Sequence, residues 1–160
     1  MFIRLLSILI VPILSTPSFG EKMDDLFEKD GLYYRKFADV PFTGAVEGNE
    51  KGSLKDGKRE GLWVWYYNNE HLFGKGEYKD GKEEGPFAWY YENGQLFLKG
   101  EYEDGKRGGL WVKYYDNGQL EYKRQYKDGK RNGHCISYYK DGSVNQDDTG
   151  TYKNGERVSN

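Results

Sequence analysis

Two histidines, one cysteine and a series of carboxylates are the residues in this 160-residue sequence that could do chemistry. His71 and His134 follow no spacing that would build a catalytic triad or a metal cluster, and each takes the place of a structural residue in a repeated pattern. Cys135 is the only cysteine, so it allows neither an internal disulfide nor a thiolate metal cluster. The sequence therefore predicts no catalytic residue, no metal site and no cofactor, and we expect the protein not to be an enzyme.

The carboxylates that recur most regularly each stand directly before a glycine. Asp-Gly is a strong turn signal, so turn geometry explains these aspartates better than paired acid–base catalysis. Lysines two positions further on should line one edge of a sheet, and the acids beside them favour a solvated rim over a site for lipid head groups. The aspartates are Asp56, Asp80, Asp104 and Asp128, and the lysines are Lys58, Lys82, Lys106 and Lys130.

These turns belong to a unit that repeats every 24 residues. The turn glycines and the tyrosine doublets both recur at this interval, which indicates a repeat architecture. The glycines are Gly57, Gly81, Gly105 and Gly129, and the doublets begin at Tyr66, Tyr90, Tyr114 and Tyr138. About four units fill residues 55–155. Residues 21–54 are expected to form a loose lead-in and a β cap, and residues 156–160 a frayed tail.

Each unit can be interpreted as a β-hairpin with a definite register. A two-residue turn at Asn93-Gly94 pairs Trp89 with Leu98 and Phe87 with Gly100. The same count places Pro86, Ala88, Lys99 and Glu101, with Tyr90 and Phe97, on the opposite side, here called the mixed face. A turn at Asp104-Gly105 pairs Leu98 with Trp111, which returns Trp111 to the side of Trp89. The sequence thus predicts an all-β fold, a single-layer antiparallel meander of repeated hairpins.

The other side of this sheet is here called the aromatic face. Hydrophobic residues make up only 36% of the chain, and Tyr occurs 15 times, so aromatic rings must supply much of the buried area. The rings either pack among themselves as a substitute core or bind a ligand or partner. The candidate binding residues on this face are Trp63, Trp65, Tyr67, Phe87, Trp89, Tyr91, Trp111 and Tyr115.

Residues 1–20 follow the pattern of a secretory signal peptide. A positive start at Arg4 precedes an apolar run over residues 5–14, and small residues lead to Gly20. We expect cleavage near Gly20 and a mature protein that is periplasmic or extracellular. The net charge of −2, with acids and bases interleaved, excludes the clustered basic face that nucleic-acid binding usually needs.

The repeated residues resemble the MORN-repeat-variant family. The unit of that family combines an Asp/Asn-Gly turn, a downstream glycine, a tryptophan, a tyrosine doublet and an Asn-Gly-Gln-Leu turn, and the match covers about residues 52–155. This resemblance implies a MORN-type β-repeat solenoid. Bacterial members are often labelled antitoxins of a toxin–antitoxin system, and MORN repeats more broadly are linked to membrane association and protein scaffolding.

Three functions are compatible with these observations. The repeat, the export signal and the missing catalytic constellation favour an exported, non-enzymatic protein-interaction or scaffolding module with an unidentified protein partner. An antitoxin or immunity protein that neutralises a toxin is one alternative. A cell-wall glycan or choline-binding repeat protein is another, because tryptophan and tyrosine rings can clasp sugars and quaternary ammonium groups. A membrane or cell-wall surface is therefore a further possible partner.

Overall fold

The computed structural model describes residues 20–159 and contains thirteen strands and one short 3₁₀ helix, η1 (Met23–Asp25). The expected signal peptide lies almost entirely outside the described residues. The strands are β1 (Leu26–Lys29), β2 (Leu32–Arg35), β3 (Gly44–Val46), β4 (Glu50–Lys55), β5 (Lys58–Tyr66), β6 (Leu72–Lys79), β7 (Lys82–Tyr90), β8 (Leu96–Glu103), β9 (Lys106–Tyr114), β10 (Leu120–Lys127), β11 (Lys130–Ser137), β12 (Gly150–Lys153) and β13 (Glu156–Ser159).

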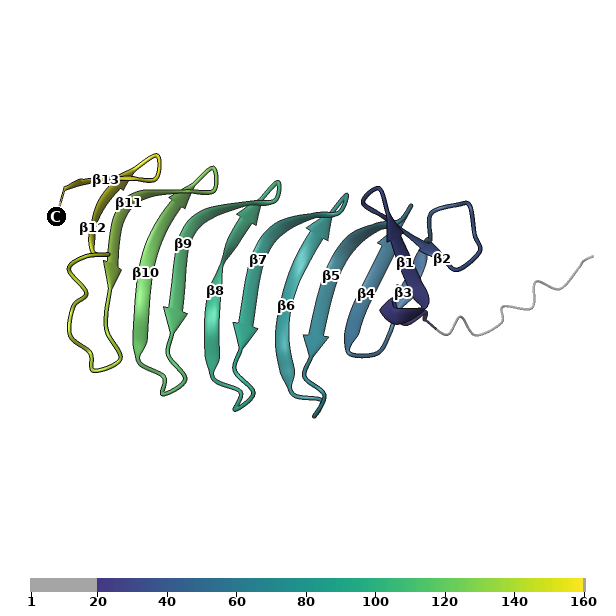
Figure 1. Ribbon diagram of the computed structural model, residues 1–160, viewed down its shortest axis with the longest axis horizontal. Coiled ribbons are helices and arrows are strands. Elements are labelled where there is room, and N and C mark those ends of the chain that lie inside the picture. Colours follow the sequence, from purple (N-terminus) through teal and green to yellow (C-terminus); the bar gives the residue numbers. More distant parts are fainter. Residues whose placement is uncertain (1–19, 160) are drawn as a thin grey trace, which may run out of the picture.

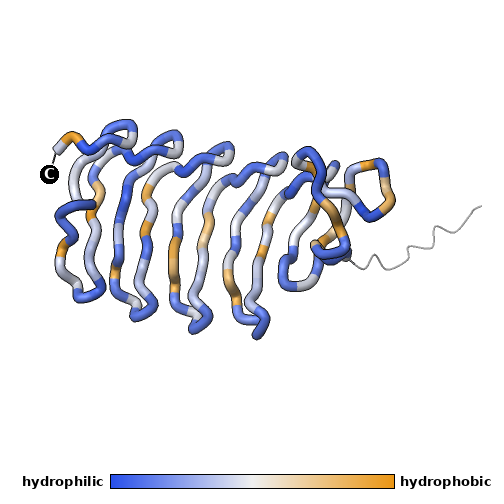
Figure 2. The backbone as a smooth tube through the Cα atoms, in the orientation of Figure 1, coloured by the Kyte–Doolittle hydropathy of each residue, from blue (hydrophilic) through white to orange (hydrophobic). Residues whose placement is uncertain are grey.

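Eleven of these strands form one antiparallel sheet. Its order runs from β3 to β13 without a crossover, so every strand pairs with its neighbours in sequence. Figure 1 shows the hairpins side by side along the long axis of the molecule, with β1 and β2 at the N-terminal end. The predicted all-β meander is confirmed. Apolar residues concentrate within the strands and hydrophilic residues at the turns (Figure 2).

The Asp-Gly dipeptides form the tight turns that the sequence predicts. Both turn residues have positive φ, as in Asp80 (51°) and Gly81 (83°), which is the geometry of a type I′ hairpin. Successive turns are joined, because the Gly81 N–H donates to the Arg59 carbonyl and the Gly105 N–H to the Glu83 carbonyl, both at 2.9 Å. Hydrogen bonds between hairpin tips thus continue the repeat beyond the strand ladder.

The opposite turns differ from the expected two-residue form. The Tyr91 N–H donates to the Gln95 carbonyl and the Gly94 N–H to the Tyr91 carbonyl, both at 2.8 Å, which makes a three-residue loop. Tyr90 therefore pairs with Leu96. A register shift between Tyr90 and Trp89 then restores the predicted pair of Trp89 with Leu98. The cause is that only Gly94 of this Asn-Gly pair has positive φ, whereas a type I′ turn needs two such residues.

A kink in each unit also changes part of the predicted register. Lys99 pairs with Val112 and Glu101 with Gly108, so three residues of β9 lie opposite Gly100. Leu98 consequently pairs with Lys113, and the expected pair of Leu98 with Trp111 is wrong. The shift is two residues, so it preserves the side to which each residue points. Figure 1 shows the odd-numbered strands bending toward their hairpin tips.

Glycine makes these kinks possible. The pair Phe87–Gly100 is confirmed, but the ring that covers Gly100 belongs to Trp111 of the following strand. A Cβ at Gly100 would lie 2.2 Å from Trp111 Cδ2, so only glycine leaves room for the indole. Gly109, inside the kinked stretch, has a φ of 59°. The sheet therefore bends where a glycine leaves room for a ring from the following strand.

The two ends of the chain contain more structure than expected. The segment expected as a loose lead-in contains η1 and β1, and β1 pairs with β2 across a type I′ turn at Asp30-Gly31. Leu26 and Phe42 then bury themselves against Trp63 and close that end of the core. The tail expected to fray forms β13, whose residues pair with β12 through a further type I′ turn at Asn154-Gly155.

The last unit replaces its rings with an ionic cluster. Cys135 and Ser137 stand where earlier units have large rings, and the longer loop before β12 brings Asp148 into this space. Asp148 accepts hydrogen bonds from Arg124, from Arg131 at 2.6 Å and from the Ser137 hydroxyl at 2.6 Å. Burial alone would raise the pKa of Asp148, but these hydrogen bonds outweigh it and hold the pKa below the ordinary carboxyl value.

Candidate functional site

The aromatic face forms the core of the protein. Trp63 and Trp111 are completely buried, and Phe87 is 3% exposed. Trp89 lies on the same side as Trp111, with ring centroids 6.2 Å apart, as the sequence predicts. Tyrosines from the even-numbered strands pack edge-on against these rings, with Tyr102 5.0 Å from Trp111. The rings therefore pack among themselves as a substitute core.

Arginine side chains cover the buried tryptophans. The Arg107 guanidinium lies 4.2 Å from the ring centroid of Trp111, and that of Arg59 lies 4.4 Å from Trp63. Where the core ring is Phe87, the corresponding residue is Glu83. In these two units, cation–π stacking thus accompanies the core tryptophan, and the arginine side chain covers that ring.

The remaining candidate residues of this face also have structural roles. Trp65 and Trp89 are half-buried, and the Trp65 indole donates to the Glu50 carboxylate at 3.1 Å. Three tyrosine hydroxyls form a ladder in which each donates to a backbone carbonyl of the next unit. These bonds run from Tyr67 to Tyr90 at 2.8 Å, from Tyr91 to Tyr114 at 2.9 Å and from Tyr115 to Tyr138 at 2.8 Å.

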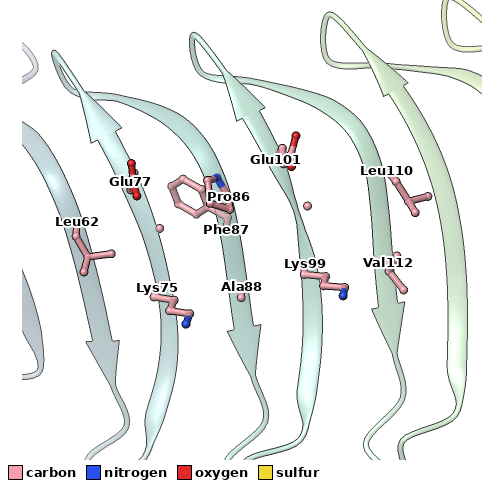
Figure 3. A pocket seen from close by; sticks show the side chains of 12 residues that line it. Leu62, Lys75, Glu77, Pro86, Phe87, Ala88, Lys99, Glu101, Leu110 and Val112 are labelled. Carbon is pink, nitrogen blue, oxygen red and sulfur yellow. The ribbon is translucent and has the colours of Figure 1, made fainter.

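The open surface lies on the mixed face. Leu62 is 57% exposed and Leu110 46%, although both are large apolar side chains. Between them lies a hollow of about 570 Å³, with Pro86 and Ala88 in its middle. Its lining comes from five successive strands, β5 to β9, and Figure 3 shows these side chains spread across the sheet. This volume falls within the range of sites that bind ligands or partner side chains.

Four charged side chains surround this hollow. Lys75 and Lys99 lie on β6 and β8 on either side of Ala88, and Glu77 and Glu101 lie on the same two strands beside Pro86 (Figure 3). The basic and acidic pairs therefore occupy opposite ends of one apolar patch. Such an arrangement is complementary to a surface that is itself apolar and carries charges of both signs.

Sequence reasoning placed Pro86, Ala88, Lys99 and Glu101 correctly on the mixed face but assigned them no role. The signal available was the alternation itself, because β5, β7 and β9 each carry two apolar residues on this side, such as Leu62 and Val64. Phe97 is an exception, since its ring packs on Tyr91 at 5.0 Å and lies beneath the Lys113 ammonium group on the aromatic side.

The histidines and the cysteine lie in separate environments. His71 Nδ1 lies 2.8 Å from the Glu92 carbonyl oxygen at a turn, His134 is exposed on the mixed face, and Cys135 is buried. Within residues 20–159, no group of three His, Cys, Asp or Glu side chains could hold a metal ion. No helix in the same residues is long and apolar enough to cross a membrane.

Comparison with known proteins gives one family. The sequence pattern described as the MORN repeat variant matches residues 59–80, 83–104 and 107–128, which contain the kinks, tight turns and buried rings described above. Repeats of this family generally bind proteins or membranes and are typically non-catalytic.

Two further comparisons add no function. No curated protein matches the sequence. Among solved structures, a chain from the crystal structure of a GtfA/B complex bound to UDP and GlcNAc is 14% identical, with a TM-score of 0.26. The similarity covers 69% of this chain and 24% of that chain. Residues 59–128 of this chain therefore contain three consecutive repeats that match the MORN repeat variant.

Proposed function

We propose that this protein is an exported, non-enzymatic interaction module that binds a protein partner through the hollow on its mixed face. The observation that carries this proposal is the exposure of Leu62 and Leu110 around an apolar hollow that no other element covers within the described residues. Large apolar side chains that lie exposed around a hollow and are rimmed by charged residues are typical of a site of interaction. The charged pairs at its two ends supply orientation.

The burial of the rings favours this surface over the aromatic face. A glycan or choline ligand would need free ring faces, whereas Trp63 and Trp111 are fully buried and stacked against arginine. The half-buried Trp65 is also held by Glu50 through its indole N–H. A protein partner on the mixed face needs none of these groups to move.

A capture experiment with matched variants tests this proposal. The purified protein is used as bait for an envelope fraction, beside the variants Ala88→Arg and Gln119→Arg. Ala88→Arg fills the hollow, and Gln119→Arg adds the same charge at an exposed turn. A specific partner should be captured by the wild-type protein and by Gln119→Arg but lost with Ala88→Arg, and the purified partner should reproduce this pattern. Equal capture by all three proteins would contradict the proposal.

The export part of the proposal has its own test. We infer that the leader is removed, so mass spectrometry of the protein isolated from its native host should show a chain that begins near Glu21. The Glu21 N–H already donates to the Ala45 carbonyl at 3.0 Å, and its carboxylate pairs with Arg35 at 2.7 Å. A chain that retains residues 1–20 in the cytoplasmic fraction would refute export.

A further inference from the structure

The charges of the mixed face form two rows that cross the sheet. Strand pairing sets Lys75 beside Ala88 and Ala88 beside Lys99, and the same level continues on both sides. The resulting row alternates lysine with small or branched apolar residues: Lys51, Val64, Lys75, Ala88, Lys99, Val112, Lys123 and Ile136. Its lysines recur on every second strand, at intervals of about 9.6 Å.

A second row lies two residues further along each strand. There the pairing sets Leu62 beside Glu77, Pro86 beside Glu101 and Leu110 beside Gln125. Lysine and glutamate on the same strand are separated by about 6.7 Å. The mixed face thus carries a basic row and, beside it, a short acidic row of two glutamates, Glu77 and Glu101, with apolar residues on β5, β7 and β9 between them. The kinks interrupt the ladder of this second row, since Glu77 pairs with Glu84 and Glu101 with Gly108 on the following strands.

These charges have no partners of their own. Within residues 20–159, the lysines in ion pairs are Lys82, Lys113 and Lys140, and the pairs involve none of the four charges around the hollow. Lys75, Lys99, Glu77 and Glu101 are all exposed. A surface that brings opposite charges to these positions would therefore gain ion pairs without breaking existing ones.

We propose that the partner of this face is a second copy of the chain, packed face to face about a two-fold axis that runs along the sheet between the two rows. Such a rotation keeps the order of the strands but reverses their direction. The basic row of one copy then meets the acidic row of the other. Lys75 faces Glu77 of the second copy, and Lys99 faces Glu101 of the second copy. This inference rests on the proposed function of the mixed face.

The charge pattern selects this axis over the other face-to-face arrangement. A two-fold axis parallel to the strands would keep the strand direction and set lysine against lysine, which repels. The chosen axis also matches the apolar columns. Leu62 meets Val64 of the second copy, Leu110 lies over β9 of the second copy, and the stems of the lysine and glutamate side chains lie over the hollow between them.

The expected complex is a weak one. A patch that spans β4 to β11 over about five residues of each strand would bury on the order of 1,100 Å² in total, at the low end for specific interfaces. We therefore expect a reversible dimer with a Kd in the micromolar range. Raising the salt concentration should weaken it, because the ion pairs lie at the surface of the sheet.

Complementary charge swaps test the arrangement. The acidic variant is Lys75→Glu with Lys99→Glu, and the basic variant is Glu77→Lys with Glu101→Lys. Each variant alone should dimerise at least tenfold more weakly than the wild-type protein, because like charges then face each other. An equimolar mixture of the two should form a heterodimer by sedimentation velocity and native mass spectrometry. The control Lys58→Glu with Lys130→Glu makes the same charge change at the turn rim and should still dimerise.

Three results would overturn the inference: a wild-type protein that is monomeric at 500 µM, charge variants that dimerise normally, or a mixture that forms no heterodimer. Circular dichroism of each variant verifies that it is folded. If the wild-type protein is monomeric but the Ala88→Arg change still abolishes capture of another protein, the second copy is excluded while the proposed function stands. If Ala88→Arg changes neither capture nor self-association, both are excluded.

Discussion

Gly100 is the position at which an added methyl group should do the most damage to this fold. A Cβ there would lie 2.2 Å from Trp111 Cδ2, 2.3 Å from Cε2 and 2.7 Å from Cγ, whereas carbon atoms in contact are normally about 3.5–4.0 Å apart. The indole would have to retreat by more than about 1 Å. It cannot do so freely, because it is fully buried between Trp89, Tyr102 and the Arg107 guanidinium.

We therefore expect Gly100→Ala to lower the free energy of unfolding by about 3 kcal/mol, the upper end for overpacking in a tight core. Gly108→Ala is the matched control, since a Cβ added there would meet no atom of another part of the chain within 4 Å and the φ of Gly108 is not positive. That change should raise the free energy of unfolding by about 0.5 kcal/mol, because alanine reduces the conformational entropy of the unfolded chain. Urea unfolding followed by circular dichroism measures both, and equal midpoints for the two variants would refute the role assigned to Gly100.

Three further predictions concern the core, the terminal cluster and the tyrosine ladder. Trp111→Phe should lower the free energy of unfolding by about 1 kcal/mol more than Trp63→Phe does, as measured by urea unfolding. The reason is that the Trp111 indole donates to the Gly108 carbonyl at 3.2 Å, whereas the buried Trp63 N–H has no partner in residues 20–159. Equal losses for the two variants would contradict this. Asp148→Asn should cost about 2 kcal/mol at pH 7, since it weakens hydrogen bonds from two arginines. The folded-state pKa of Asp148 lies below the unfolded value of about 3.9, so its contribution is present above that pH and is lost as pH falls through the folded-state pKa. Urea titrations from pH 7 to pH 2 should show a larger acid-side loss in the wild-type protein than in Asp148→Asn, because other carboxylates with lowered pKa values, such as Asp104, act in both proteins. Parallel profiles would be the contrary result. Tyr91→Phe should cost about 1 kcal/mol by leaving the Tyr114 carbonyl without its donor, and an unchanged urea midpoint would show that the ladder contributes nothing.

Much of the fold follows from the local chemistry of the turns. Asp-Gly supplies two consecutive residues that tolerate positive φ. The positions of the type I′ turns, and hence the points at which the chain reverses between these strands, could therefore be predicted. The pair of Phe87 with Gly100 followed from the count at Asn93-Gly94, because the register shift beyond that three-residue loop restores the predicted pairing. Because the kink at Gly109 inserts two residues, Trp111 kept its predicted side even though its predicted partner was wrong.

The kinks themselves could not be predicted from hairpin counting. They depend on a contact between a glycine and a ring from the next strand, as between Gly76 and Phe87, and alternation along one strand contains no information about it. The same bend buries Trp63 and Trp111 and leaves Leu62 and Leu110 in solvent. The sequence therefore predicts the candidate site at the rings, whereas the exposed leucines and the hollow lie on the other side of the sheet.

Side-chain footprinting with hydroxyl radicals, read out by mass spectrometry, tests most directly which face of the sheet binds. The protein is oxidised alone at low concentration and again in its complex, either with a captured partner or with itself at high concentration. We predict that Leu62, Pro86 and Leu110 lose reactivity in the complex while Trp65 and Trp89 keep theirs. Protection of the two tryptophans, with the leucines unchanged, would contradict the account.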